Sequence, residues 1–131
     1  MTTELLVLAW GCVLAIVHVF AAVRVKTRQY GTNWNMGARD ETLPPPEPIV
    51  GRLARAQANY FETFPVAAVA ILLVTLTERT SVVTEIGAIL WLAMRILYLP
   101  IYALGIPKIR TIIFIASVLG ILMILRPVLL P

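Results

Sequence analysis

Four long runs of apolar residues restrict what this chain can fold into. A membrane-spanning helix needs about 20 consecutive, mainly apolar residues, and we predict such helices at about residues 5–25, 50–77, 82–103 and 109–127. The chain is 60% hydrophobic and only 14% charged, whereas soluble domains are roughly half apolar and about a quarter charged. We therefore predict an all-α integral membrane protein, with a four-helix transmembrane bundle as a single domain over residues 1–131.

A polar segment separates the first two predicted helices. It covers about residues 26–49 and includes three consecutive prolines, Pro44, Pro45 and Pro46. Glycine, asparagine and proline are typical of loops, and a proline run favours an extended backbone. The other two connections, TERTS and LGIPK, are short, so consecutive helices are expected to be antiparallel neighbours.

The distribution of lysine and arginine predicts the orientation in the membrane. The first and third loops and their flanks carry Arg24, Lys26, Arg28, Arg39, Arg52, Lys108 and Arg110, whereas the opposite side carries Arg79 and Arg126. Because basic residues favour the cytoplasmic side, we expect a multi-pass protein with these two loops in the cytoplasm and both termini away from it. Membrane topology explains the basic residues better than nucleic-acid binding does, so we expect no nucleic-acid partner.

A polar stripe begins the second predicted helix. Arg52, Arg55, Asn59 and Glu62 are spaced by three, four and three residues, which places them on one helix face. A span of about 20 residues would start near Gln57 and would place Asn59 and Glu62 inside the membrane. A carboxylate at that depth is costly unless it is paired. The stripe therefore predicts either a functional site or a structural salt bridge.

The third predicted helix offers a partner for this carboxylate. Arg95, Tyr98 and Tyr102 also share one face, and Arg95 lies at a depth comparable to that of Glu62. We expect Arg95 and Glu62 to approach each other, directly or across a subunit interface. Together the two faces favour a site for an anionic, polar ligand. No metal site is expected, since the single histidine, His18, stands alone and no cluster has metal-ligand spacing.

The segment RAQANYFETFP, Arg55 to Pro65, resembles the second-helix signature of the MAPEG family (membrane-associated proteins in eicosanoid and glutathione metabolism). It is most similar to the branch of the leukotriene C synthases and microsomal glutathione transferases, where the arginine-alanine-glutamine opening recurs. The series Arg95, Tyr98 and Tyr102 matches the family at the same spacing. The resemblance extends over about the whole chain.

The resemblance implies a homotrimer whose outer surface contacts membrane lipid. It also implies that glutathione, as a co-substrate, binds between neighbouring subunits. The residues that it assigns to glutathione binding are Arg24, Arg55, Gln57, Asn59, Glu62, Arg95, Tyr98 and Tyr102. It assigns activation of the thiol to Arg110, although the interval from Tyr102 is one residue longer than in the synthases. A nearby positive charge lowers the pKa of a thiol and stabilises the thiolate.

The activity implied is that of a glutathione-dependent transferase or peroxidase, which conjugates lipophilic electrophiles or reduces lipid hydroperoxides. Two departures, Thr63 and Phe114 at positions where related members have tyrosine, leave the substrate class open. One alternative is a non-catalytic lipid-binding or scaffold member of the same family, but the pair Arg55 and Glu62 favours an enzyme. A transporter or channel subunit is a further alternative, which the concentration of polar residues at one end disfavours.

Overall fold

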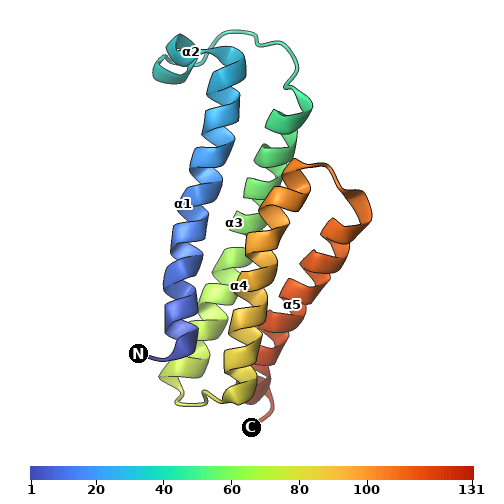
Figure 1. Cartoon of the computed structure of the whole chain (residues 1–131). Coiled ribbons are helices and arrows are strands. Elements are labelled where there is room, and N and C mark those ends of the chain that lie inside the picture. Colours follow the sequence, from blue (N-terminus) through green and yellow to red (C-terminus); the bar gives the residue numbers. More distant parts are fainter.

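The computed structural model describes residues 1–131, and its regular secondary structure consists of helices without strands. Their bounds are α1 Thr3–Tyr30, α2 Thr32–Met36, α3 Pro48–Leu76, α4 Val82–Ala103 and α5 Pro107–Leu129. The four long helices are each long and apolar enough to cross a membrane, which confirms the predicted all-α membrane bundle. Figure 1 shows them side by side, with both termini at one end. The opposite end carries α2 and the α4–α5 loop, and we call it the basic end.

The helix boundaries follow from local capping chemistry. Ser81 and Thr84 form a reciprocal capping box at the start of α4, which satisfies backbone N–H groups that lack helical partners. The helices α3 and α5 both begin with proline in the first turn, where its missing N–H has no cost. The α4 helix ends at Ala103, and in the turn that follows Gly105 has a φ of +73°, a left-handed conformation that glycine adopts without strain.

The segment at residues 26–49, which was predicted to be a loop throughout, is partly helical, so this prediction is wrong in part. The α1 helix continues to Tyr30 and the short α2 helix follows, because lysine, arginine and glutamine are good helix formers even where no apolar face marks the helix. The remaining loop is tied to the end of α1. Gln29 and Tyr30 donate side-chain hydrogen bonds to the carbonyl oxygens of Pro45 and Pro44, at 3.0 and 2.9 Å.

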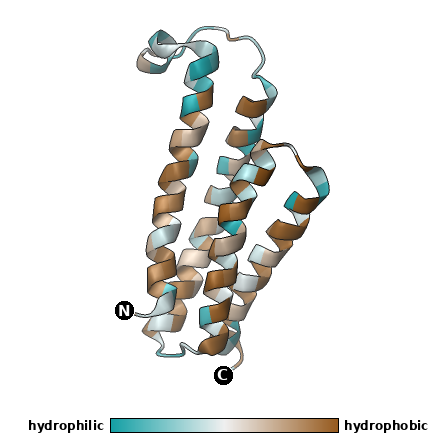
Figure 2. Ribbon diagram, in the orientation of Figure 1, coloured by the Kyte–Doolittle hydropathy of each residue, from teal (hydrophilic) through white to brown (hydrophobic).

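The core lies between the helices in the half of the bundle near the termini. Its largest cluster consists of Val7, Leu14, Tyr60, Ala67, Ala70, Ile71, Val74, Ala88, Trp91, Ile121 and Ile124. Many other large apolar side chains, including Trp10, Phe20 and Ile112, are exposed on the outside of the bundle, and apolar segments run along every long helix in Figure 2. Such an apolar exterior is the surface that a bilayer covers.

Two glycines bring α4 and α5 into backbone contact. A Cβ atom built on Gly87 would lie 2.8 Å from the carbonyl oxygen of Gly120, and one built on Gly120 would lie 2.6 Å from that of Gly87. Small residues permit this approach in membrane bundles. From this contact α5 diverges from α4 toward the basic end (Figure 1), so the two helices are furthest apart where the polar residues lie.

Replacing Gly120 by alanine should destabilise the bundle. The added methyl group would displace the Gly87 carbonyl, and overpacking of this kind costs about 1–3 kcal/mol. Thermal unfolding of the detergent-purified protein measures the change. Gly51→Ala is the matched control, because its methyl group would meet only the flexible side chain of Arg55. Equal stability of the two variants would contradict the importance of the glycine contact.

Candidate functional site

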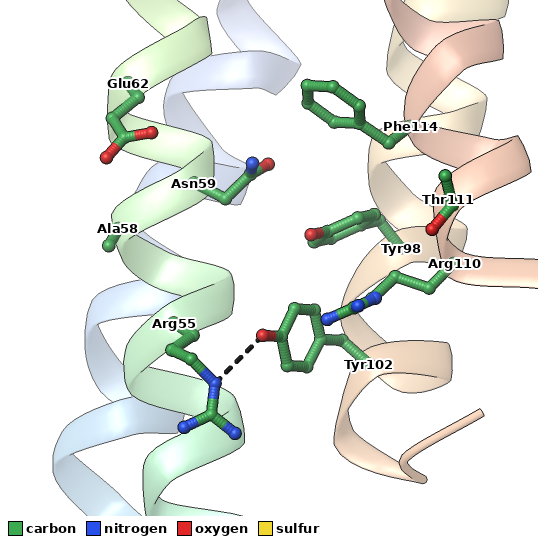
Figure 3. Close-up of a pocket in the computed structure, with 9 residues that line it drawn as sticks. All are labelled: Arg55, Ala58, Asn59, Glu62, Tyr98, Tyr102, Arg110, Thr111 and Phe114. Atoms are coloured by element: carbon green, nitrogen blue, oxygen red, sulfur yellow. Dashed lines mark hydrogen bonds between the residues drawn. The ribbon is translucent and has the colours of Figure 1, made fainter. Parts of the chain in front are cut away.

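A cavity of about 420 Å³ opens at the basic end, between α3 on one side and α4 and α5 on the other. We call it the main cavity. Figure 3 shows its lining from three helices: Arg55, Ala58, Asn59 and Glu62 of α3, Tyr98 and Tyr102 of α4, and Arg110, Thr111 and Phe114 of α5. Spacings of four residues place successive side chains one above the other on each helix. Asn59 follows Arg55, Tyr102 follows Tyr98, and Phe114 follows Arg110 in this way.

Tyr102 holds two arginines that come from different helices. Its hydroxyl accepts a hydrogen bond of 3.0 Å from Nε of Arg55, and its ring centroid lies 4.6 Å from the guanidinium carbon of Arg110. Cations over aromatic faces gain roughly 0.5–2 kcal/mol. Neither guanidinium is ion-paired with a carboxylate, so both retain N–H donors for a ligand. This end of the cavity is therefore suited to an anionic group.

Asn59 adds a neutral polar group in the middle of the cavity wall. Its side chain points across the gap toward Tyr98 and Phe114 (Figure 3), and its Oδ1 atom is buried without a hydrogen-bond partner. Buried polar atoms are nearly always hydrogen-bonded. The amide nitrogen, which is not among the buried atoms, is therefore the group that a polar ligand such as a peptide can contact. Glu62 lies at the outer edge of the lining, where its carboxylate is exposed and points away from α4 and α5.

The predicted approach of Arg95 and Glu62 is not found and is corrected. Arg95 is 0% exposed and lies inside the bundle, with its guanidinium carbon 4.4 Å from the ring centroid of Tyr98 and 5.4 Å from that of Tyr60. A side chain enclosed in this way is not accessible to a neighbouring subunit either. A step of three residues turns a helix about 60° short of a full turn. This offset places Glu62 outward from Asn59, whereas Arg95 faces inward.

The interior around Arg95 is polar but has no counter-ion. None of its three guanidinium nitrogens has a hydrogen-bond partner, and the same holds for both ring nitrogens of His18, which stacks on Tyr60 with ring centroids 4.6 Å apart. The positive charge of Arg95 is held by the faces of two tyrosines instead. Tyr98 therefore contacts Arg95 with its ring and also lines the main cavity.

Two further predicted residues lie outside the main cavity. Gln57 lines a small pocket of about 90 Å³ between α1 and α3, together with Lys26, Trp34 and Arg39. Arg24 is exposed on α1, which packs on α3 and α4 but not on α5. The structure thus brings together Arg55, Asn59, Glu62, Tyr98, Tyr102 and Arg110, and it separates Arg24, Gln57 and Arg95 from them.

The lining includes three residues that sequence reasoning did not assign to the site. Thr111 places a hydroxyl group beside Arg110, Phe114 forms an apolar wall, and Ala58 leaves space on α3. The four-residue interval from Arg110 to Phe114 was a usable signal, because it predicts a shared helix face. Nothing in the sequence marks Ala58. The cavity consequently joins a cationic, polar side to an apolar wall.

Comparison with known proteins supports one family. The family model of the MAPEG family matches residues 7–129 of the chain. Comparisons with curated proteins and with solved structures give no significant match.

A double-mutant cycle should measure the contact between Arg95 and Tyr98. Tyr98→Leu should destabilise the protein strongly, because it leaves a buried charge with less compensation. The loss should be smaller in an Arg95→Met background, with a coupling of about 1–2 kcal/mol. Thermal or denaturant unfolding in detergent checks this. Phe114→Leu, which removes an aromatic ring that does not contact Arg95, should give additive losses; additivity for Tyr98 as well would refute the contact.

Proposed function

Because the chain belongs to the MAPEG family, we propose that it is a membrane-embedded glutathione transferase or peroxidase. Its substrates would be lipophilic electrophiles or lipid hydroperoxides, as in the branch of the leukotriene C synthases and microsomal glutathione transferases. The observation that carries the proposal is the convergence of Arg55 and Arg110 on Tyr102 at one cavity. This arrangement presents two unpaired guanidiniums to a ligand that has carboxylates and a thiol.

The lining complements glutathione group by group. Arg55 supplies a charged donor for a carboxylate, and Asn59 supplies an amide for a peptide group. Glu62 supplies a carboxylate for the ammonium group at the outer edge. Tyr102 supplies a hydroxyl group between the arginines, and Tyr98 supplies one nearer Asn59. Arg110, at the first turn of α5, is then left for the sulfur.

Arg110 would act by electrostatic stabilisation of the thiolate. The thiol proton leaves to solvent at the basic end, and the guanidinium stabilises the sulfur anion. Attack on an electrophilic carbon forms a carbon–sulfur bond, and the carbanion or leaving group takes up a proton. Attack on a hydroperoxide breaks the O–O bond and forms a sulfenic acid on the sulfur, while the lipid alkoxide takes up a proton from solvent and leaves as an alcohol. A second glutathione converts the sulfenic acid to a disulfide and water. Phe114 offers the apolar side for either substrate.

A homotrimer would explain the residues that lie outside the main cavity. Arg24 and Gln57 are on the α1 side of the bundle, away from α5. In a trimer, this side of one subunit would face the main cavity of the next, and both residues would then reach the bound glutathione. The proposed orientation places the basic end in the cytoplasm and both termini opposite, because the lysine and arginine residues concentrate there.

A second candidate function is a non-catalytic lipid-binding member of the family. The observation in its favour is an apolar groove of about 360 Å³ between α1 and α4, lined by Trp10, Val13, Leu14, Val17, Leu92 and Ile96. Such a groove suits a hydrocarbon chain and contains no polar side chain. Catalytic turnover with glutathione separates the two functions.

Glutathione should bind saturably to the detergent-purified protein, and Arg55→Ala should weaken binding at least about tenfold. The loss of one charged hydrogen bond costs on this order. Isothermal titration calorimetry measures both affinities. Arg28→Ala, which removes an exposed arginine of α1, is the control and should bind as the wild type does. Absence of binding to the folded wild-type protein would favour the lipid-binding function.

Arg110→Ala should lower turnover by about a hundredfold, the typical effect of removing one donor to a developing anion. Glutathione affinity should change little. Because the guanidinium lowers the pKa of the bound thiol, its loss should move the rising limb of the pH–rate profile to higher pH. Steady-state kinetics with a lipophilic electrophile test this, with Lys108→Ala, two residues earlier on α5, as the control. An unchanged pH profile would remove Arg110 from the mechanism.

A further inference from the structure

A second recess of about 190 Å³ adjoins the main cavity at the basic end. We call it the basic recess. It shares Arg55, Tyr102 and Arg110 with the main cavity and adds Arg52 and the turn between α4 and α5, at Gly105, Ile106 and Pro107. No acidic residue lines it. Three guanidiniums therefore surround one small space without a carboxylate among them.

The position of Arg52 in the recess is fixed by the α4–α5 turn. Its Nη1 atom donates a hydrogen bond of 3.2 Å to the carbonyl oxygen of Ala103. Gly105 leaves the space that the guanidinium occupies, because a Cβ atom there would lie 2.8 Å from Cζ of Arg52. Arg52 lines the basic recess but not the main cavity. The recess thus has one arginine of its own and two that it shares.

Three positive charges around one cavity repel one another, and an anion between them offsets this repulsion. Guanidinium groups offer paired N–H donors that match the oxygens of phosphate, and such contacts are among the stronger hydrogen bonds in proteins. The three arginines come from two helices, and Tyr102 holds two of them. The arrangement therefore suits a multiply charged oxyanion better than a neutral ligand.

We propose that the basic recess binds the phosphate of an anionic phospholipid headgroup. The recess lies at the end of the transmembrane helices, where lipid headgroups are found. Next to it, the apolar side chains of Leu104 and Ile109 are 72% and 50% exposed, as expected for residues that contact the start of the acyl chains. A soluble phosphate would bind the same donors but has no apolar part to contact this surface.

Occupation of the recess regulates the main cavity, because Arg55 and Arg110 serve both. A phosphate that engages them leaves fewer donors for the carboxylate and the sulfur of glutathione. Anionic lipid therefore lowers the affinity for glutathione. This coupling rests on the proposed function, whereas phosphate binding itself does not.

The first experiment measures binding of inorganic phosphate to the full-length protein in neutral detergent, without glutathione. Calorimetry is run at constant ionic strength, with chloride in place of phosphate as the reference. Wild type and Lys108→Gln should bind phosphate alike, and Arg52→Gln should bind it at least about tenfold more weakly. Lys108 is a matched control, because it is an exposed cation of the same region that does not line the recess. Equal phosphate affinity in all three proteins would overturn the site.

The second experiment identifies the source of the phosphate. The proteins are placed in phosphatidylcholine nanodiscs with or without phosphatidic acid, and the affinities for glutathione and for inorganic phosphate are measured. Phosphatidic acid should weaken glutathione binding in wild type and Lys108→Gln but not in Arg52→Gln. If phosphate binds in detergent but phosphatidic acid changes neither the glutathione affinity nor the phosphate affinity in nanodiscs, the lipid is overturned as occupant.

Arg52→Gln also distinguishes the recess from the glutathione site. Its glutathione affinity, measured without phosphatidic acid, should match that of wild type. An equal loss of glutathione and phosphate affinity would overturn the separate subsite, because the recess would then be part of the glutathione site. If no protein binds glutathione, the proposed function fails, while the phosphate titration still decides the recess.

Discussion

The backbone contact of α4 with α5 at Gly87 and Gly120 determines where a polar site can exist in this bundle. Two helices that pack closely along their whole length leave no space for a ligand between them. Here the helices touch near the termini and diverge toward the other end (Figure 1). The space between them is lined by polar residues because it opens at the end where water and headgroups are present.

The second general feature is the use of aromatic rings in place of carboxylates beside buried and half-buried arginines. Arg95 lies against Tyr98, and Arg110 lies against Tyr102. A carboxylate would neutralise each guanidinium and would compete with any anionic ligand. A ring compensates part of the desolvation cost but leaves the net charge intact. The site therefore keeps a net positive charge that attracts a bound anion.

The sequence predicted the parts of the fold that depend on local periodicity. The lengths of the apolar runs located the membrane helices, and the four-residue intervals placed Arg55 with Asn59, and Tyr98 with Tyr102, on common faces. It did not predict the surroundings of Arg95, because spacing on one helix does not determine which way that face turns in the bundle. The family resemblance was confirmed. The separation of Gln57 from the cavity depends on packing between helices, which no interval within one helix encodes.

The hydrogen bonds that tie the proline-rich loop to α1 have a mechanical consequence. Tyr30 and Gln29 fasten this loop at the basic end, so α1 and α3 form one hairpin there and α4 and α5 form another. Across that end, side-chain hydrogen bonds join the hairpins only from Arg52 and Arg55, to Ala103 and Tyr102. A ligand that contacts both Arg55 and Arg110 therefore connects the two hairpins at this end. Its binding free energy includes the cost of any change in the distance between the hairpins.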